Sequence, residues 1–228
     1  MTVCVILGDK SDIASALRPL MIQDDWHVAG WNRYTPGVAN LPHWDVCLIA
    51  IGQVKPVGPW WQQDAYEWDS AVESNILLPV KLLRRIWGKR KPGASVAFMA
   101  GSNPNLVMPN YTAYATGKMA LLKAVEHMDY ETPDAKMFAL GPGTVLTKIH
   151  NATRASGVSN PRLAQADKDG GTPIERIWSC LRWCIRQPKS VVGGRNICVS
   201  DSPDWDKEVL LANRLKDAPA LFKLRRVE

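Results

Sequence analysis

The chain has 228 residues, of which 46% are hydrophobic and 22% are charged, and its formal net charge is +6. This length fits one α/β domain, residues 1–228, and this composition excludes a disordered chain. No stretch approaches the roughly 18 uninterrupted apolar residues of a membrane span, and no recognised motif accompanies the positive charge, so we expect neither a membrane nor a nucleic-acid partner.

The start of the chain and its cysteines both indicate the cellular compartment in which we expect the protein. The first residues run directly into an apolar segment, with no basic flank and no small-residue cleavage site. We therefore expect no secretory leader and a cytoplasmic protein with reduced thiols. Cys4, Cys47 and Cys198 lie in apolar runs, where a thiol behaves as a small core residue. Cys180 and Cys184 share a helix face without a nearby histidine, so we expect no metal site.

Six short apolar runs rich in β-branched residues are predicted as strands. In chain order they are residues 2–7, 26–31, 45–51, 95–100, 136–140 and 196–200. Amphipathic helices are predicted between most of them. The clearest stripe contains Trp68, Val72, Ile76, Val80, Leu83 and Trp87, and a second contains Ile174, Ile177, Trp178, Leu181 and Cys184. Continuous apolar strands that alternate with such helices predict a doubly wound parallel sheet in a three-layer αβα arrangement.

Two intervals depart from this alternation. Residues 32–44 include two prolines and a glycine and are too short for a strand plus a crossover helix, so we expect a loop there. Residues 151–171 are rich in Gly, Asn, Ser, Asp and Lys. We expect a flexible loop at about 148–171, inside the single domain.

The segment after the first predicted strand has two interpretations. A turn between a strand and a helix aims backbone N–H groups and the helix N-terminus at one point, which suits a pyrophosphate. The candidate residues are Gly8, Lys10, Ser11, Asp12 and Ile13. Only Gly8 remains of the three glycines expected in such a turn, and Asp12 could simply cap the helix. The isolated segment therefore fits a cofactor turn and a plain strand–turn–helix equally well.

The end of the second predicted strand bears on which cofactor would bind. Dinucleotide folds that prefer NAD place an acidic residue there, whereas this chain has Asn32 and Arg33. Arg33 could hold a 2′-phosphate through a charge-assisted contact, and Lys10 could add to it, although a solvated arginine is the alternative. We expect NADP(H) in preference to NAD(H).

Tyr114 and Lys118 are four residues apart in a segment with helical character. On a helix their side chains project from the same face. A nearby ammonium stabilises phenolate, so we expect it to lower the pKa of Tyr114 from about 10 toward the working pH. Such a pair suits the movement of a proton on or off a carbonyl oxygen.

The residues around this pair lead to a resemblance. Ser102 precedes Tyr114 by twelve residues, Asn75 lies inside an apolar helix face, and residues 140–147 end the next strand. With these segments in this order, the sequence resembles the short-chain dehydrogenase/reductase family in its classical Tyr-x-x-x-Lys form. The resemblance covers almost the whole chain, from Gly8 to residues 191–194, and implies a Rossmann fold.

The resemblance also implies roles for the residues that would carry the chemistry. Tyr114 resembles the general acid/base, and Lys118 the residue that lowers its pKa and binds the nicotinamide ribose. Ser102 resembles the hydroxyl that orients the substrate oxygen, although it lies one residue nearer the tyrosine than usual and Gly101 occupies the ungapped position. Asn75 resembles the residue that holds a water linking Lys118 to solvent.

Further residues are implied on the cofactor side. Pro142, Gly143 and Thr147 match the segment that contacts the nicotinamide carboxamide. Residues 49–52 read Ile-Ala-Ile-Gly and resemble the family's Asn-Asn-Ala-Gly stretch, although both asparagines are lost. The resemblance places Gly52 beside the cofactor. His150 follows Thr147 and could contact the substrate or not.

The resulting hypothesis is an NADP(H)-dependent oxidoreductase that reduces a carbonyl or oxidises an alcohol by hydride transfer. Its partner is a small-molecule substrate, and the resemblance implies a homodimer or homotetramer. A catalytically silent NAD(P)-binding sensor is one alternative, favoured by the altered glycine turn. A nucleotide-sugar epimerase or dehydratase is another, although such enzymes carry a larger C-terminal domain than residues 201–228 provide.

Overall fold

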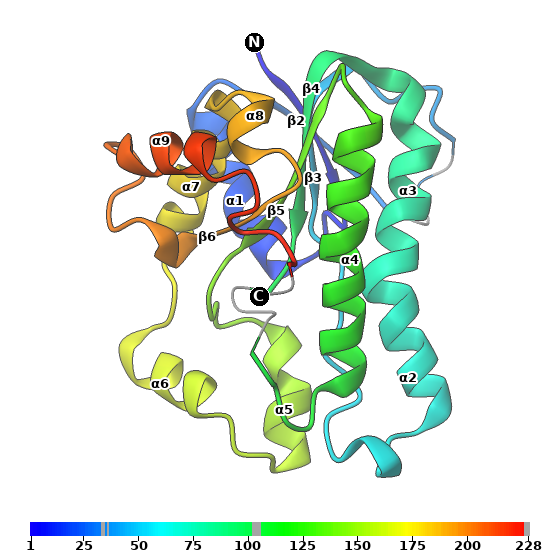
Figure 1. Ribbon diagram of the computed structural model, residues 1–228. Helices are drawn as coiled ribbons and strands as arrows, with labels where there is room; N and C mark the ends of the chain where they lie inside the picture. The colour runs from blue at the N-terminus through cyan, green and yellow to red at the C-terminus, as the bar shows by residue number, and fades with distance from the viewer. Residues whose placement is uncertain (33–34, 36, 102–105, 226–228) are drawn as a thin grey trace.

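The computed structural model describes residues 1–32, 35, 37–101 and 106–225. Within these residues, six strands form one parallel sheet in the order β2-β1-β3-β4-β5-β6 (Figure 1). The strands are β1 (Val3–Leu7), β2 (His27–Trp31), β3 (Trp44–Ile49), β4 (Arg90–Met99), β5 (Lys136–Gly141) and β6 (Asn196–Cys198). The predicted parallel sheet is confirmed.

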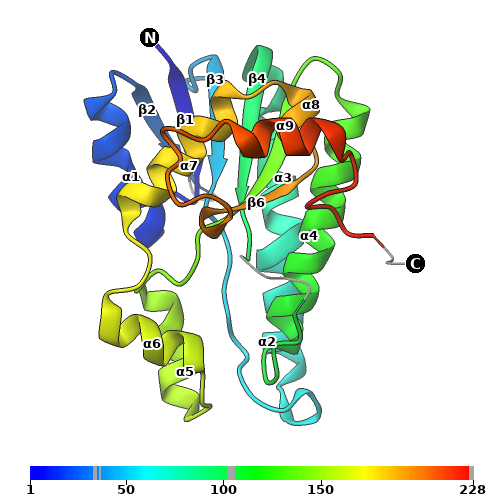
Figure 2. The ribbon, with the colours of Figure 1, turned by 60° about the vertical axis from the view of Figure 1, so that its left-hand side comes forward.

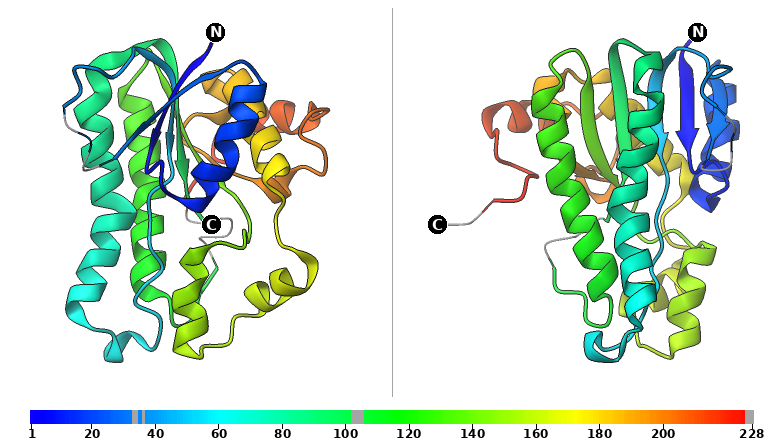
Figure 3. Two further views of the ribbon diagram at one scale, coloured as in Figure 1. Left: turned by 180° about the vertical axis from the view of Figure 1, so that it is seen from behind. Right: turned by 90° about the vertical axis from the view of Figure 1, so that its right-hand side faces the viewer.

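Helices cover both faces of this sheet (Figures 1 and 3). On one side lie α2 (Ala65–Val72), α3 (Leu78–Ile86) and α4 (Thr112–Glu131). On the other side lie α1 (Asp12–Gln23), α7 (Ile174–Arg186), α8 (Lys189–Val192) and α9 (Leu210–Asp217). The three-layer αβα arrangement is therefore confirmed.

The layers follow from the alternation of side chains along each strand. In β1, Cys4 and Ile6 face the core that α1 and α7 cover, whereas Val5 and Leu7 face the core under α3 and α4. Each of these four side chains is fully buried. All five cysteines of the chain are buried free thiols, as expected for a reduced protein.

The order of the strands places the functional loops. From β1 the chain crosses outward to β2 and then returns to build β3 through β6 on the other side of β1. In such sheets ligands bind outside the carboxyl ends of the strands, where this reversal occurs. The loops after β1, β3, β4 and β5 therefore belong to one edge. Between β2 and β3, the described residues 32, 35 and 37–43 contain neither helix nor strand, so the predicted loop is confirmed for these residues, and Trp44 already begins β3.

The helical segment before β4 differs in detail from the predicted stripe. The α2 and α3 helices are joined by a π-helical turn, η2 (Glu73–Leu77). Ala71 and Ile86, which are not in that stripe, are buried, whereas Val72 and Ile76 of the stripe are only partly buried; Leu83 is buried as predicted. The segment packs against α4 as well as the sheet, so the most buried row is offset from the predicted one.

The segment predicted as a loop at about 148–171 is largely helical. It contains the short helices α5 (Asn151–Ser156) and α6 (Pro161–Asp169), which begin after a 3₁₀ turn, η4 (Lys148–His150). Each of the two helices ends at a glycine in the left-handed conformation, Gly157 or Gly170. These glycines serve as helix C-caps, so the composition that suggested a loop marks helix ends instead. The flexibility of the segment remains a prediction.

The remaining short turns are η1 (Trp60–Gln62), η3 (Trp87–Lys89) and η5 (Val199–Asp201). Helices α5 and α6 and the η1 loop lie beyond the carboxyl edge of the sheet, next to one end of α2 and α4 (Figure 2). None of the helices in the described residues is both long and apolar enough to span a lipid bilayer.

Candidate active site

Helix α4 brings Tyr114 and Lys118 to the carboxyl edge of the sheet. Lys118 is buried, and its Nζ donates hydrogen bonds to the carbonyl oxygens of Met99, at 2.9 Å, and Ile51, at 3.4 Å. Met99 ends β4, and Ile51 lies just after β3. The ammonium is therefore fixed at the ends of two adjacent strands.

The hydroxyl of Tyr114 faces the residue that follows this strand edge. A β-carbon at Gly101 would lie 3.9 Å from the Tyr114 oxygen. This is ordinary van der Waals contact, so a side chain at position 101 would reach the phenol. Ser102, the predicted substrate-orienting residue, lies outside the described residues. In this chain the position that the structure brings to Tyr114 is a glycine, which offers no hydroxyl.

Asn75 lies in the π-helical turn and is fully buried. Its Nδ2 donates to the carbonyl oxygens of Ala71 and Gln53, both at 2.8 Å. Its Oδ1 accepts no hydrogen bond from any described residue. A β-carbon at Gly52 would lie 2.7 Å from this oxygen and 3.0 Å from Nζ of Lys118. Asn75, Gly52 and Lys118 thus form one cluster, with a buried acceptor left for a non-protein donor.

Gly117 explains how α4 approaches the π-helical turn so closely. A β-carbon at this position would lie only 2.8 Å from Cβ of Asn75. Real β-carbons are essentially never that close to another carbon atom, so any larger residue would push the two helical segments apart. The glycine next to Lys118 therefore keeps the lysine and the asparagine together, a role that the sequence did not reveal.

Burial sets the protonation of the tyrosine–lysine pair. It raises the pKa of Tyr114 to about 12 and lowers the pKa of Lys118 to about 8. The expectation that the ammonium lowers the pKa of Tyr114 toward the working pH is wrong for the protein alone. Burial disfavours the charged phenolate and the charged ammonium alike, and it is the cause of both shifts.

The turn after β1 is a glycine turn with side-chain supports. Gly8 has a φ of +82°, and a β-carbon there would lie 2.8 Å from the carbonyl oxygen of Ala50. Ser11 caps helix α1, because its Oγ accepts the backbone N–H of Ala14 at 3.2 Å. The suggested alternative, Asp12 as the helix cap, is therefore wrong. Ile13 packs its side chain on the core, so only its backbone N–H is available to the turn.

Asp12 is paired with a residue far away in the sequence. Its Oδ2 accepts the backbone N–H of Lys148 at 2.7 Å, and its Oδ1 lies 2.9 Å from Nζ of the same lysine. The pKa of Asp12 is lowered, first by the hydrogen bond from the backbone of Lys148. Nζ of Lys148 also donates to the carbonyl oxygen of Lys10 at 3.1 Å. The side chain of Lys10 itself is exposed.

The end of β2 is close to a carboxylate from the glycine turn. Nδ2 of Asn32 donates to Oδ1 of Asp9 at 3.2 Å. A β-carbon at Gly30 would lie 2.4 Å from the other oxygen of Asp9, so this glycine makes room for the carboxylate. Arg33, the predicted 2′-phosphate ligand, lies outside the described residues. The sequence has no acidic residue at the end of β2, but the structure places the carboxylate of Asp9, from the turn after β1, beside this strand end.

The loop after β5 carries the residues predicted to meet a nicotinamide. Pro142 is buried, and Gly143 has a φ of +79°. A β-carbon at Gly143 would lie 2.2 Å from Oγ1 of Thr172, so the loop is packed against the segment that follows α6. Thr147 is partly buried, and its Oγ1 donates to the carbonyl oxygen of Val145 at 3.4 Å.

Tyr111 is a buried connector and not a pocket wall. Its hydroxyl donates to Oγ1 of Thr153 in α5 at 3.1 Å and accepts from Nδ2 of Asn160, the cap of α6, at 3.0 Å. These two partners lie more than forty residues away, and sequence reasoning did not identify them. His150 is partly buried, and its pKa is lowered chiefly by burial.

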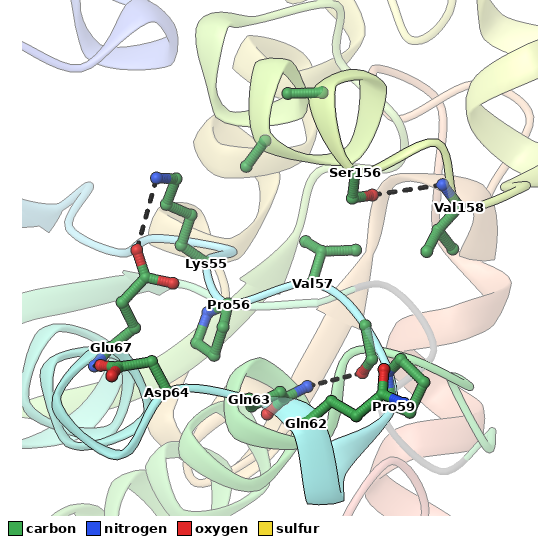
Figure 4. A pocket seen from close by; sticks show the side chains of 13 residues that line it. Lys55, Pro56, Val57, Pro59, Gln62, Gln63, Asp64, Glu67, Ser156 and Val158 are labelled. Carbon is green, nitrogen blue, oxygen red and sulfur yellow. Dashed lines mark hydrogen bonds and ion pairs between the residues drawn. The ribbon is translucent and has the colours of Figure 1, made fainter.

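A cavity of about 510 Å³ opens between the loop after β3 and α5 (Figure 4). Its lining includes Lys55, which pairs with Glu67 at 3.4 Å, and Gln63, which donates to the carbonyl oxygen of Gly58 at 2.7 Å. Apolar residues such as Val57 and Val158 line it together with further polar ones, among them Asp64 and Ser156. Neither Tyr114 nor Lys118 lines this cavity, which lies farther along the same edge and was not identified from the sequence.

Within the described part of the chain, no three His, Cys, Asp or Glu side chains come together as a metal site would require. The predicted residues instead form three neighbourhoods along the carboxyl edge. They are the Tyr114–Lys118–Asn75 cluster, the Gly8–Asp12 turn with Lys148, and the end of β2 with Asp9.

Comparison with known proteins supports a single fold. No protein-family model matches the chain. It is similar to two proteins described as short chain dehydrogenases, mpl6 of Monascus purpureus and citE of Monascus ruber. Each is 24% identical over 178 residues, which is 75% of this chain. The match spans 55% of the length of each relative.

Solved structures match over more of the chain. A short chain dehydrogenase/reductase from Saccharomyces cerevisiae is 16% identical, with a TM-score of 0.75, and covers 93% of this chain and 99% of its own. A small-chain dehydrogenase in complex with NADPH is 18% identical, has a TM-score of 0.72, and covers 86% of this chain and 95% of its own. A 4-hydroxyisoleucine dehydrogenase complexed with NADH is 17% identical, has a TM-score of 0.67, and covers 87% of this chain and 96% of its own. The chain therefore has the Rossmann-type αβα fold of the short-chain dehydrogenase structures.

Proposed function

We propose that the chain is a nicotinamide-dependent oxidoreductase in which Tyr114 is the general acid/base. The observation that carries this proposal is the cluster at the carboxyl edge of β3 and β4. There a phenol, a buried ammonium and an amide oxygen without a partner among the described residues lie on α4 and η2. A merely structural helix contact does not require such an oxygen, because a buried polar group costs free energy unless it is hydrogen-bonded.

The residues present fit a dinucleotide along the edge. Backbone N–H groups in the first turn of α1, at Asp12 and Ile13, lack intrahelical partners by geometry and would hold the phosphates, whereas the N–H of Ser11 donates to the carbonyl oxygen of Gly8. Lys118 would hold the ribose next to the nicotinamide, and the loop 142–147 would contact the carboxamide. Gly8 and Gly52, which have no side chain, leave room beside Ala50 and Lys118. When bound, a reduced nicotinamide supplies the hydride that a carbonyl carbon accepts.

The protein's own part in the reaction is the proton. With a pKa of about 12, Tyr114 is a neutral phenol at physiological pH and can donate its proton to the carbonyl oxygen as the hydride arrives. The resulting phenolate is stabilised by the ammonium of Lys118, and Oδ1 of Asn75 can hold the water through which Lys118 exchanges protons with solvent. Because the phenol is the resting form, we propose that reduction of a carbonyl is the favoured direction.

For the cofactor we propose NADP(H) over NAD(H). The support is the sequence at the end of β2, where Asn32 and Arg33 replace a carboxylate. The carboxylate of Asp9 lies beside Asn32 and carries a negative charge toward the same place. The negative charge of Asp9 therefore reduces the preference for NADP(H) over NAD(H), because it repels a 2′-phosphate.

The substrate is proposed to be a small carbonyl compound or alcohol. We also propose, from the resemblance alone, that the chain forms a homodimer or homotetramer through the helices that carry Trp68 and Tyr114. The cytoplasmic location remains a prediction of the sequence. A catalytically silent sensor is the competing function, and the altered residues in the glycine turn are what favour it.

The test compares Tyr114→Phe with Tyr130→Phe, a fully matched change at an exposed tyrosine on the same helix. NADPH oxidation is followed with a panel of aldehydes, ketones and quinones. We expect Tyr114→Phe to lower kcat by about 10² to 10⁴-fold with little change in the Kd of NADPH, and Tyr130→Phe to leave both unchanged. Wild-type turnover by Tyr114→Phe would contradict the acid role. Tight NADPH binding without turnover of any carbonyl by the wild type would support the sensor.

A further inference from the structure

Lys148 connects two loops that lie at separate ends of the carboxyl edge. Its backbone N–H donates to Oδ2 of Asp12, its Nζ lies 2.9 Å from Oδ1, and the same Nζ donates to the carbonyl oxygen of Lys10. Lys148 follows the loop after β5, whereas Asp12 begins α1 after β1. These contacts join residues 136 and 138 positions apart in the sequence.

The connection ends at the turn where the proposed function puts the diphosphate. Strands β3 and β4 separate β1 from β5 in the sheet, and Lys148 joins the segment after β5 to the N-terminus of α1. The lysine side chain is 67% exposed, so its ammonium is open to a ligand in solution. The bridge is therefore accessible and not part of the core.

The charges in this bridge would oppose phosphate binding if Asp12 stood alone. A carboxylate in the first turn of a helix interacts favourably with the helix dipole, and a diphosphate would seek the same end. Lys148 neutralises that carboxylate. Its ammonium has three N–H donors, of which Asp12 and Lys10 engage two, so one donor is left for a third acceptor.

We propose that Lys148 is a phosphate-binding residue whose ammonium contacts the diphosphate of the dinucleotide, and that Asp12 and the Lys10 carbonyl position it. This inference rests on the proposed function and extends it to a residue outside the Tyr-x-x-x-Lys cluster and the glycine turn. In this arrangement a side-chain cation from the β5 loop adds to the backbone N–H groups of a turn that keeps only one of the three expected glycines.

The test measures equilibrium binding to the full-length protein by calorimetry. The probes are NADPH, ADP-ribose and adenosine 2′-monophosphate, of which only the last has no diphosphate. We expect Lys148→Met to raise the Kd of NADPH and ADP-ribose about tenfold or more, which is the loss of one charge-assisted hydrogen bond, and to leave adenosine 2′-monophosphate within about twofold. Lys148→Arg keeps the charge and should recover most of the affinity.

Two further variants make the result specific. Lys168→Met removes an exposed lysine of α6 outside the bridge and should bind all three probes like the wild type. The double variant Lys148→Met/Asp12→Asn distinguishes two roles of Lys148, direct contact with the diphosphate and neutralisation of the Asp12 carboxylate. If Lys148 contacts the diphosphate, the double variant stays weak. Recovery of wild-type affinity in the double variant would show that Lys148 only cancels the charge of Asp12, and would overturn the proposal.

The remaining outcomes distinguish this inference from the proposed function. If the wild type binds NADPH or NADH and Lys148→Met binds equally well or more tightly, the phosphate contact is wrong and the oxidoreductase proposal stands. If the wild type binds neither dinucleotide, both are wrong. Thermal unfolding of each variant checks folding, and Tm should change little because exposed ion pairs contribute about 0–1 kcal/mol.

Discussion

The two ends of the proposed cofactor site are built in different ways. At the catalytic end, Lys118 and Asn75 are buried side chains that α4 and η2 hold against strand ends. At the nucleotide end, Asp9 and Asp12 are partly exposed and are satisfied by partners from other segments, Asn32 and Lys148. One end depends on packing, and the other depends on compensated charges.

This difference follows from the chemistry that each end would perform. Proton transfer needs one hydroxyl and one ammonium at defined atoms, so the side chains themselves cannot be exchanged. Phosphate binding at a helix N-terminus uses backbone N–H groups, which any residue except proline provides. Side chains in the turn after β1 can therefore vary, provided that an added negative charge finds a cation. The comparison predicts that the catalytic end is sensitive to shape and the nucleotide end to charge.

The largest effect is expected from a substitution that disrupts the packing of the catalytic end. Gly117→Val adds a side chain where a β-carbon alone would lie 2.8 Å from Cβ of Asn75. We expect a loss of about 1–3 kcal/mol in the free energy of unfolding, because overpacking forces the helices apart. Urea unfolding measures this loss. Gly88→Val is the control, since a β-carbon at Gly88 meets nothing within 4 Å. Equal stability of the two variants would contradict the close approach of α4 and η2.

The second prediction concerns the pH dependence of the same end. With pKa values of about 8 for Lys118 and about 12 for Tyr114, Lys118 loses its proton first as the pH rises. The value of kcat/KM for carbonyl reduction should be constant below about pH 8 and should fall by up to about tenfold per pH unit above it. Alcohol oxidation needs the phenolate beside the charged ammonium, so its kcat/KM should increase with pH up to about pH 8 and level off above it. Steady-state kinetics from about pH 6 to about pH 10 test this, and a reductive rate that rises with pH would contradict the assignment.

The smallest effect sharpens the role of charge at the nucleotide end. Asp9→Asn keeps an oxygen that can accept the hydrogen bond from Asn32 but removes the charge. We expect the Kd of NADPH to fall roughly fivefold relative to that of NADH, with unchanged stability, because a charge near the 2′-phosphate is lost. Asp69→Asn, on the exposed surface of α2, is the control. An unchanged ratio of the two Kd values would place Asp9 away from the adenosine ribose.

The sequence predicted those features that depend on local order along the chain. The strand positions, the parallel sheet and the placement of Tyr114 and Lys118 on one helix follow from periodicity, which survives in any tertiary context. The position of Asn75 in a buried helical segment was also predicted, because a single amide within an apolar helix face is visible in the sequence, whereas its role remains a prediction.

Other features depend on contacts between distant segments. The raised pKa of Tyr114 results from burial, and burial is set by how α4 packs. The pairing of Asp12 with Lys148 and of Asn32 with Asp9 requires loops from different strands to meet. No spacing rule within one segment could indicate these pairs. Helices α5 and α6 were missed because their capping glycines resemble the composition of a loop.

The hydroxyl of Tyr111 has a mechanical consequence for the proposed acid. Tyr111 precedes Tyr114 by three residues and is hydrogen-bonded to α5 through Thr153 and to the cap of α6 through Asn160. The hydrogen bonds of this one hydroxyl therefore tie α5 and α6 to the residue that lies one helical turn before the phenol that would protonate a substrate. A molecule bound beside α5 would lie against the same hydrogen-bonded segment, so the wall of the cavity and the helix of the proposed proton donor share one buried oxygen atom.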